Sequence, residues 1–343
     1  MHARWIGLGL VSPVDLYAAC QGLAQAQEAR DFAPVVLWGR CDRPHVSLGA
    51  SQWAEAELDL EACRSLGVEV VQRCLGGGTV LVDPDQWCFF FVLPRVRTPA
   101  SRDRLFETCL APVAATFRDM GLVVERVGRG DLWLDGRKIL GSGAATLGQA
   151  DVFGASFLLR FQTGLFARLV RSPSDGFREW LEQELERGMT AWDQHGRLPG
   201  ETELRACFQR HIGACLGWAL QEDQPAPREQ DMIAQARAEL AEPLEAGGRR
   251  LVENGVKINH RTYLIEHRDV QGGVRMLVRD GVIARLSVEP VPPPRVISAC
   301  LGVAPRIERL EPALAKVLDD RSARVWAERL DHAAAGVRSA QDG

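Results

Sequence analysis

Residues 72–80 read QRCLGGGTV and lie between two short apolar runs, at 68–71 and 80–82, that are typical of buried strands. Three consecutive glycines are costly, because glycine loses the most backbone entropy on folding, and they occur where a chain turns tightly or approaches a ligand closely. Free N–H groups in such a loop can hold a phosphate or a carboxylate, and Arg73 adds a planar cationic donor. The spacing matches neither G-x-x-x-x-G-K-S/T nor G-x-G-x-x-G, so it predicts neither a Walker loop nor a Rossmann fingerprint. A glycine-rich turn without a ligand is the alternative interpretation.

A second segment, residues 128–144, reads GRGDLWLDGRKILGSGA and contains the strong two-residue hairpin signal Asp-Gly. Alternation along its second strand predicts that Lys138 and Leu140 lie on one face and that Arg137 and Ile139 lie on the other. A lysine that points between two glycine-rich segments is suited to stabilise an anionic intermediate. A solvated lysine in an ordinary hairpin is the alternative.

The composition limits the classes of partner. The 343 residues include 41 basic and 45 acidic side chains, so the formal net charge is −4, which argues against a broad nucleic-acid-binding surface. The nine cysteines are scattered and no two have C-x-x-C spacing, which favours reduced thiols in the core over a disulfide framework or a zinc knuckle. No apolar run approaches the roughly 18 residues of a transmembrane helix, and the N-terminus lacks a signal-peptide pattern. We therefore expect a cytoplasmic protein with no membrane or nucleic-acid partner.

A change of composition predicts two domains. Residues 221–228 read QEDQPAPR, and this polar, proline-containing segment is the predicted linker. Residues 1–220, in which helix and strand signals both occur, would form the first domain. Residues 229–343 would form a small α+β module that contains a helix at 229–241, three short strands and a terminal helix.

Both glycine-rich segments, in this order, resemble motifs of the biotin/lipoate A/B protein ligase family, and in particular its lipoate-protein ligase A branch. The family's R-R-x-S-G-G-G-x-V loop is echoed by residues 72–80, and its N-D-L…G-x-K-I-x-G segment is echoed by residues 130–141. Upstream, L-W at 37–38 and S-L-G-A-S-Q at 47–52 are similar to further stretches of the family. The resemblance covers about residues 10–220.

This resemblance implies an α+β fold in which residues 1–220 form a catalytic core of mixed β-sheet flanked by helices, and residues 229–343 form a small α+β accessory domain. It also implies an ATP-dependent lipoate- or octanoate-protein ligase. ATP, with Mg²⁺, would activate the acyl carboxylate as an acyl-adenylate, because a carboxylate is a poor electrophile until one of its oxygens becomes a good leaving group. The acyl group would then pass to a lysine of a lipoyl carrier domain or of a glycine-cleavage H-like protein.

The resemblance also implies roles for individual residues. Lys138 is the implied catalytic residue, since its ammonium would neutralise the carboxylate and the α-phosphate in both transition states. Arg73 would help to dock the nucleotide phosphates, and Asp131 would bind the adenylate or a magnesium-linked group. The implied binding positions are Arg73, Gly76, Gly77, Gly78, Thr79, Asp131, Gly141 and Ser156.

Four positions depart from the family's pattern: Gln72 stands for an arginine, Leu75 for a serine, Gly130 for an asparagine and Gly154 for a histidine. These departures fall on the nucleotide- and acyl-binding side, whereas the catalytic lysine is kept. Three hypotheses therefore stay open. The chain is an active ligase, an octanoyltransferase of the same fold that works without ATP and for which Cys74 is the candidate acyl carrier, or a non-catalytic scaffold or binding subunit.

Overall fold

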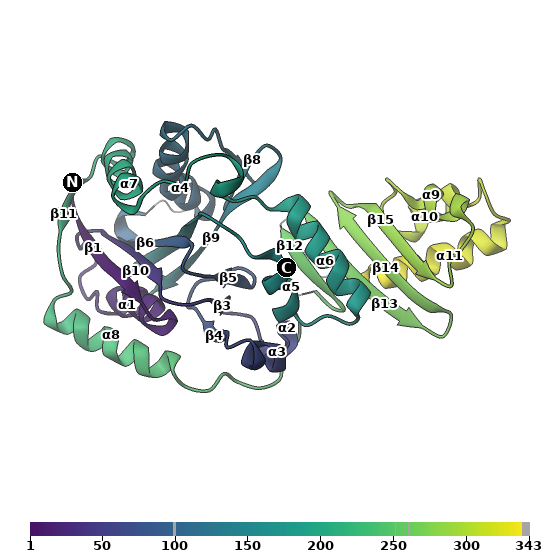
Figure 1. Cartoon of the computed structure of the whole chain (residues 1–343), viewed down its shortest axis with the longest axis horizontal. Coiled ribbons are helices and arrows are strands. Elements are labelled where there is room, and N and C mark those ends of the chain that lie inside the picture. The colour runs from purple at the N-terminus through teal and green to yellow at the C-terminus, as the bar shows by residue number, and fades with distance from the viewer. Residues whose placement is uncertain (99–100, 251, 260, 338–343) are drawn as a thin grey trace. The chain divides into compact units, whose positions relative to one another are not determined.

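The computed structural model describes residues 1–98, 101–250, 252–259 and 261–337, and Figure 1 labels its helices and strands. Contacts divide the chain into two compact units. The first comprises Met1–Ala54, Leu60–Gln162 and Glu186–Ala246, and the second comprises Glu55–Asp59, Thr163–Leu185 and the chain from Gly247 on. The end of the predicted accessory domain, at 338–343, lies outside the described residues.

An eight-stranded mixed sheet forms the centre of the first unit, in the order β11–β1–β2–β6–β10–β9–β8–β7. Its strands are β1 (His2–Val11), β2 (Val35–Cys41), β6 (Gln86–Pro94), β7 (Glu125–Val127), β8 (Asp131–Leu134), β9 (Arg137–Leu147), β10 (Ala150–Leu158) and β11 (Ala219–Glu222). The β11–β1 and β1–β2 pairs are parallel, and the other neighbouring strands pair antiparallel. The mixed sheet confirms the predicted α+β core.

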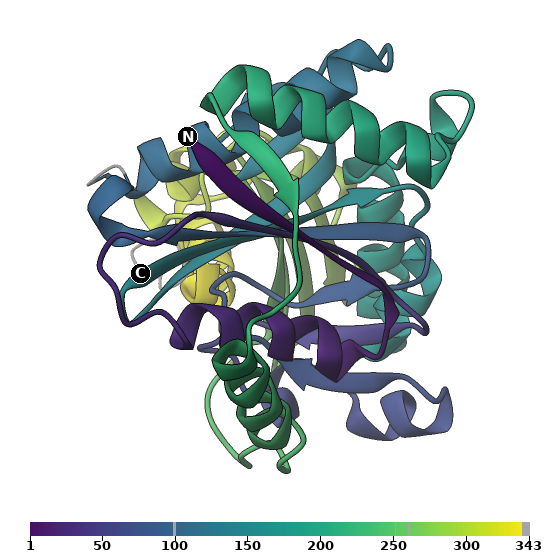
Figure 2. The same cartoon turned by 90° about the vertical axis from the view of Figure 1, so that its left-hand side faces the viewer.

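Helices cover both faces of this sheet. The helices of the first unit are α1 (Pro13–Gln25), α3 (Leu60–Ser65), α4 (Arg102–Asp119), α7 (Glu201–Leu216) and α8 (Pro227–Leu240), with the 3-10 helices η1 (Arg95–Arg97) and η2 (Trp192–Gln194). Figure 2 shows α1 on one side of the sheet and α4 and α7 on the other. Because successive side chains of a strand point to opposite faces, the wholly apolar centre of β6 enters both cores. Phe89 and Phe91 pack with residues of α4 and α7, whereas Cys88 and Phe90 pack with residues of α1.

A separate three-stranded sheet, in the order β4–β3–β5, carries the glycine-rich segment. Its strands are β3 (His45–Leu48), β4 (Glu69–Gln72) and β5 (Val80–Val82). β3 runs parallel to β4 and antiparallel to β5. Since β4 and β5 lie on opposite sides of β3, the loop of residues 73–79 that joins them must cross the end of β3. We call this segment the crossing loop.

The predicted linker differs from the division that the structure shows. Residues 221–228 end β11 and begin α8, and both elements belong to the first unit: β11 pairs with β1, and α8 packs on α1. Arg4 of β1 donates hydrogen bonds to the carboxylates of Asp223 (2.5 Å) and Glu229 (2.6 Å). The segment is polar because it forms an edge strand and the capped start of a helix. The helix predicted at 229–241 corresponds to α8, which is part of the first unit.

The second unit contains a four-stranded antiparallel sheet in the order β12–β13–β14–β15. Its strands are β12 (Gly255–Asn259), β13 (Thr262–Asp269), β14 (Gly272–Arg279) and β15 (Val282–Glu289), and its helices are α5 (Thr163–Leu169), α9 (Pro294–Cys300), α10 (Ile307–Leu314) and α11 (Asp320–Ala333). Two further helices, α2 (Ala54–Glu57) and α6 (Asp175–Gly188), cross a boundary between the units along the sequence. The three strands predicted in the module are β13, β14 and β15. Met276 on β14 packs with Leu310 and Leu330 of α10 and α11 in the core of this unit.

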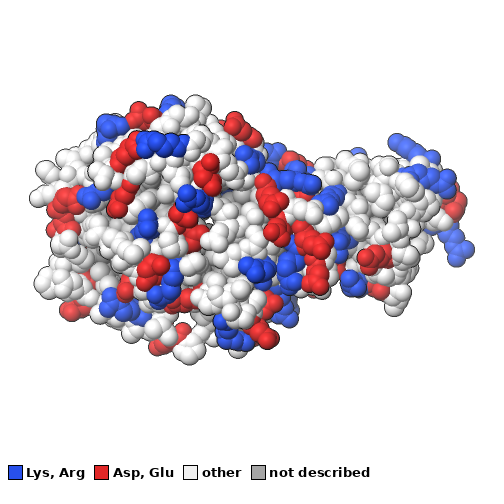
Figure 3. Space-filling view, in the orientation of Figure 1, with Lys and Arg blue, Asp and Glu red and all other residues white. Residues whose placement is uncertain are grey.

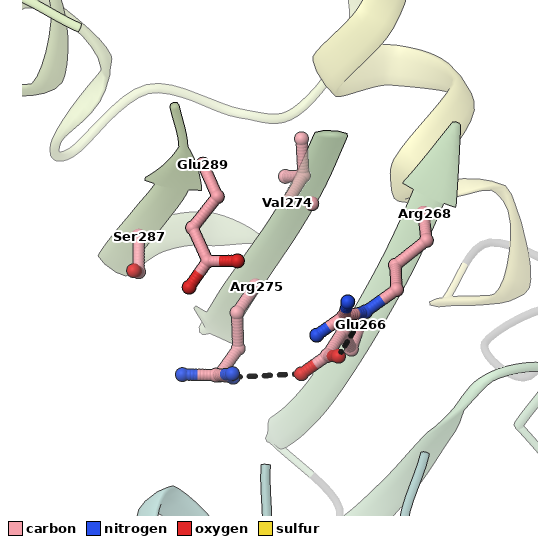
Figure 4. A pocket seen from close by; sticks show the side chains of 7 residues that line it. Glu266, Arg268, Val274, Arg275, Ser287 and Glu289 are labelled. Atoms are coloured by element: carbon pink, nitrogen blue, oxygen red, sulfur yellow. Dashed lines mark hydrogen bonds and ion pairs between the residues drawn. The ribbon is translucent and has the colours of Figure 1, made fainter. Parts of the chain in front are cut away.

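One hollow in the second unit is lined by charged side chains of β13 to β15. Glu266 accepts hydrogen bonds from Ser174 (2.7 Å), Arg275 (2.8 Å) and Arg268 (3.1 Å). Figure 4 shows Glu266 of β13 between the two guanidinium groups, with Glu289 on β15, beyond the strand that carries Arg275. Although burial opposes its ionisation, these hydrogen bonds hold the pKa of Glu266 below its usual range. The charges in this hollow thus neutralise one another.

Charged side chains of both signs intermingle over the face drawn in Figure 3. Exposed ion pairs of the described chain include Arg178 with Asp175 (2.7 Å) and Arg197 with Glu203 (2.6 Å). Such exposed pairs each contribute about 0–1 kcal/mol to stability. Among the helices of the described ranges, none combines the length and the apolar character that crossing a bilayer requires.

Candidate active site

The buried side chain of Arg73 holds the crossing loop by hydrogen bonds to its carbonyl oxygens. Its Nη1 donates to the carbonyl (2.8 Å) and hydroxyl (3.2 Å) oxygens of Ser47, and its Nη2 donates to the carbonyl oxygens of Gly76 (3.1 Å) and Gly78 (2.8 Å). The guanidinium is buried, with 8% of the residue exposed. Gly77 and Gly78 are exposed, and their N–H groups donate to no partner within the described part of the chain. Arg73 therefore engages the loop itself, and the loop presents unpartnered amides of the kind that bind anions.

Gly49 and Gln52 hold the crossing loop from the other side. A Cβ atom on Gly49 would lie 2.0 Å from the carbonyl oxygen of Gly77, so only glycine fits where the loop crosses the end of β3. Gln52 Oε1 accepts a hydrogen bond from the N–H of Gly49 (2.9 Å), and its Nε2 donates to Thr79 Oγ1 (3.0 Å). Gln72, one of the departures, donates to the carbonyl oxygen of Gln52 (2.9 Å). The predicted site residues omit Gly49 and Gln52, whose only sequence signal is the G-x-x-Q spacing.

Lys138 and the crossing loop meet one face of β9. The Nζ of Lys138 lies 2.9 Å from Asp131 Oδ1, with 18% and 14% of the two side chains exposed. A Cβ on Gly141 would lie 2.8 Å from this Nζ, and a Cβ on Gly143 would lie 2.7 Å from the carbonyl oxygen of Gly76. Residues two apart on a strand share a face. The structure thus brings together Lys138, Asp131, Gly141 and the loop glycines, as the two sequence segments predicted.

The simple alternation predicted for β9 is wrong. The β8–β9 register shifts between Leu132, opposite Leu140, and Trp133, opposite Lys138, which leaves Ile139 as an extra residue. Ile139 and Leu140 are consequently both buried in the core, with 0% and 2% exposed. A bulge of this kind re-aims the neighbouring side chain. The predicted pairing of Lys138 and Leu140 on one face fails because of this bulge.

Residues 189–195 support the β8–β9 hairpin from outside the predicted site. The N–H of Thr190 donates to the carbonyl oxygen of Lys138 (2.9 Å), and its Oγ1 lies 2.7 Å from His195 Nε2. Arg137 donates to Gln194 Oε1 (2.7 Å). These contacts join β9 to a segment more than fifty residues later in the chain, and no sequence motif marks them.

Two departures from the family's pattern touch each other, and one predicted site residue has its hydrogen-bond partner on β6. A Cβ on Gly154 would lie 2.6 Å from Leu75 Cδ1 and 2.6 Å from Phe90 Cδ1, so the leucine at 75 fills the space that a side chain at 154 would need. Leu75 is 3% exposed in the core that α1 covers. Ser156 donates its hydroxyl to Gln86 Oε1 (3.0 Å), so its observed partner belongs to β6.

Cys74 points toward α1. Its thiol is half-buried, packs against the core that α1 covers, and makes a hydrogen bond with the thiol of Cys20. This hydrogen bond lowers the pKa of Cys74, whereas burial raises the pKa of Cys20. The thiol therefore faces a second cysteine beneath the crossing loop.

His45 is the first residue of β3, the strand whose end the crossing loop crosses. The side chain is fully buried, and its Nε2 lies 3.3 Å from the hydroxyl of Tyr17. Burial lowers the pKa of His45 to about 3. An unfolded histidine titrates near 6.5, so between these pH values the unfolded chain binds a proton that the folded chain does not. The stability contribution of neutral His45 is complete above pH of about 6.5 and is lost as the pH falls, at about 1.4 kcal/mol per pH unit.

We therefore expect the free energy of unfolding of the wild type to fall by about 2 kcal/mol more than that of His45→Gln between pH 7 and pH 5. Urea unfolding at both pH values measures this difference. His2→Gln, which removes an exposed histidine from the same unit, is the control and should follow the wild type. An equal loss in wild type and His45→Gln would show that His45 does not carry this pH dependence.

The fold of the first unit is that of solved lipoate-protein ligases. A bi-partite lipoate protein ligase from Thermoplasma acidophilum, solved as part of a study of its E2 lipoyl domain, superposes with a TM-score of 0.65 at 20% identity, covering 70% of this chain and 93% of that chain. A lipoate-protein ligase A bound with ATP superposes with a TM-score of 0.60 at 20% identity, covering 70% and 95%. At this identity the similarity establishes the fold.

The chain belongs to the family of the lipoyl protein ligase A/B catalytic domain, which matches residues 18–212. The octanoyltransferase LipM of Carboxydothermus hydrogenoformans is 49% identical over 78 residues, which is 23% of this chain and 29% of that relative. The alignments span only 29–34% of the lengths of the curated relatives that the chain matches. The family that the two glycine-rich segments indicated is confirmed.

Proposed function

We propose that this protein is an ATP-dependent lipoate- or octanoate-protein ligase. The observation that carries the proposal is the position of the Lys138 ammonium on the face of β9 that the crossing loop also covers. A fixed cation beside unpartnered loop amides suits a reaction between two anions, a carboxylate and a triphosphate. The family membership and the similarity to a ligase solved with ATP support it.

In the first step, a carboxylate oxygen of the acyl substrate attacks the α-phosphorus of ATP, and the bond to the β-phosphate oxygen breaks. Pyrophosphate leaves, and the acyl-adenylate forms. Lys138 offsets the repulsion between the two anions, and the amides of Gly77 and Gly78 hold phosphate oxygens. Asp131 keeps the ammonium in place before the substrates arrive. Mg²⁺ would enter with the triphosphate, and Asp131 is the acidic side chain of the site that would meet it.

In the second step, the amine of a carrier lysine attacks the acyl carbonyl carbon, and AMP leaves as the amide forms. The carrier is a lipoyl domain or a glycine-cleavage H-like protein. The study of the Thermoplasma acidophilum ligase with its E2 lipoyl domain supports the first of these. Gly76, Thr79, Gly141 and Ser156 remain proposed binding positions for the adenylate or the acyl group, while Arg73 acts by holding the loop.

The similarity to octanoyltransferase LipM favours a second candidate function, transfer of an octanoyl group without ATP. The acyl group would move from one carrier's thioester to a protein thiolate, the first thiol leaving, and then to an amine. Cys74 is the thiol of the crossing loop, and the neighbouring Cys20 favours its thiolate. Because this thiol faces α1, the ligase is the function that the geometry supports better.

A gel-shift assay on a panel of carrier domains, with and without ATP, tests both candidates. We expect acylation by lipoate or octanoate only with ATP and Mg²⁺, accompanied by pyrophosphate release. Cys74→Ser should keep this activity. ATP-independent transfer from octanoyl-carrier, with an octanoyl mass increment on Cys74 that Cys74→Ser lacks, would instead establish the transferase. Absence of ATP binding, pyrophosphate release and acyl transfer would refute both and leave a non-catalytic subunit.

A further inference from the structure

Three side chains that play no part in the proposed reaction converge where α4 packs on α7. Asp119 is the last residue of α4, and Cys207 and His211 lie four residues apart on α7, so they share one face of that helix. Cys207 Sγ and His211 Nε2 each lie 3.3 Å from the same oxygen, Asp119 Oδ2. The three potential ligand atoms all lie within 4.8 Å of one another.

We propose that Asp119, Cys207 and His211 form a zinc site, with a water molecule as the fourth ligand. Tetrahedral zinc, with bonds of about 2.0–2.3 Å to oxygen, nitrogen and sulfur, holds its ligand atoms about 3.3–3.6 Å apart. The two separations from Asp119 Oδ2 already have this value. Thiolate, imidazole and carboxylate together form a donor set that favours zinc over magnesium or calcium.

The proton balance is simple. The Cys207 thiol, which donates to Asp119 without metal, releases its proton to solvent as the zinc–sulfur bond forms. His211 binds as the neutral ring through Nε2, with its proton on Nδ1. Zinc binding to this tautomer therefore releases one proton, that of the Cys207 thiol.

Arg210 competes with the metal for the same carboxylate. Its guanidinium pairs with Asp119 Oδ2 and also lies 3.4 Å from Cys207 Sγ. The side chain is 61% exposed, so it can move into solvent when a cation takes its place. We expect Arg210→Gln to bind zinc about twofold to fivefold more tightly, because the variant loses one exposed ion pair in the metal-free state.

Such a site would fasten the end of α4 to the middle of α7. These two helices pack together over the aromatic face of the large sheet, where Phe117 of α4 and Phe208 of α7 belong to one core cluster. Cys207 itself is 4% exposed, whereas His211 has 20% of its side chain exposed. The site is therefore open to solvent on the histidine side, which gives the metal an entry path.

The test is metal binding by the full-length chain, stripped with EDTA and reconstituted with Zn²⁺ or Co²⁺. We expect one zinc per chain after dialysis, a thiolate-to-cobalt charge-transfer band with Co²⁺, and a melting temperature that rises with zinc. Cys207→Ser and His211→Asn should lose all three. Cys215→Ser, which removes an exposed thiol from the same helix, should keep them.

Two results would overturn the proposal. One is wild-type protein that retains no zinc and gives no charge-transfer band. The other is retention by Cys207→Ser and His211→Asn equal to that of the wild type. Because His211 is partly exposed, its substitution keeps the test valid if Cys207→Ser fails to fold. None of these readouts depends on acyl transfer, so failure here is separable from failure of the ligase proposal.

Discussion

Lys138→Ala is expected to abolish formation of the acyl-adenylate, with a loss of at least about 10²–10³-fold in the rate of pyrophosphate release. The substitution removes the cation that lies beside the crossing loop and leaves the nearly buried carboxylate of Asp131 without its ion-pair partner. Only three of the 41 basic residues are lysines, at 138, 257 and 316, so this chain uses arginine almost everywhere else. The ammonium of Lys138 lies 2.8 Å from the point where a Cβ on Gly141 would be, so the space is narrow. A compact ammonium fits there, whereas the broader planar guanidinium of arginine would not fit.

Pyrophosphate release with ATP, Mg²⁺ and lipoate measures this effect, with the adenylate itself detected by mass. Lys316→Ala removes one of the other two lysines and should match the wild type, and Lys138→Arg should stay inactive. Circular dichroism and the melting temperature show whether Lys138→Ala still folds. A folded Lys138→Ala variant that releases pyrophosphate at the wild-type rate would contradict the assigned role of this lysine.

The second large effect is expected from a single methyl group at the crossing point of the loop. Gly49→Ala would place its Cβ 2.0 Å from the carbonyl oxygen of Gly77, which is backbone and cannot turn aside. Either the loop or β3 must shift, and the hydrogen bond between Gln52 and Thr79 would be lost with it. We expect a loss of about 1–3 kcal/mol in the free energy of unfolding. Activity should fall at least about 100-fold, because a displacement of the order of 1 Å misplaces the loop amides.

Gly200→Ala is the matched control for this substitution. Gly200 precedes α7 with φ −71° and ψ 157°, an extended conformation that alanine also adopts, and no atom lies within 4 Å of an added Cβ. Its activity should stay near that of the wild type, and its stability should fall by less than that of Gly49→Ala, since alanine is only a poorer N-cap than glycine. If Gly49→Ala retained wild-type unfolding free energy and activity, the close approach of the crossing loop to Gly49 would not be needed for folding or for catalysis.

Local sequence was sufficient where one short segment contains the whole signal. The three glycines at 76–78 predicted a tight loop, and the Asp-Gly turn predicted the hairpin that carries Lys138. The family then followed from the order of these two segments. Each signal is local because glycine's backbone freedom and the geometry of a two-residue turn belong to a few consecutive residues.

Composition alone misassigned the segment at 221–228. A polar stretch with prolines has the same composition whether it forms a free linker or an edge strand followed by a capped helix. Its partner, Arg4, lies more than two hundred residues away in the chain, and the ion pairs with Asp223 and Glu229 exist only in the folded unit. The same limit applies to Ile139, whose bulge depends on the register between β8 and β9.

By itself, then, the sequence determined the family, the α+β core, the glycine-rich loop and the lysine beside it. The tertiary structure decided that Arg73 holds loop carbonyls, that Leu75 fills the space above Gly154, and that Asp119 meets Cys207 and His211. Arg73 reaches carbonyl oxygens only three and five residues away, but it does so in a loop whose course depends on crossing the end of β3. The contacts of Leu75 and Asp119 join residues far apart in the chain, which meet only when the strands and helices pack. Local conformational preferences can be read from neighbouring residues, but partners across the fold exist only once strands and helices have packed.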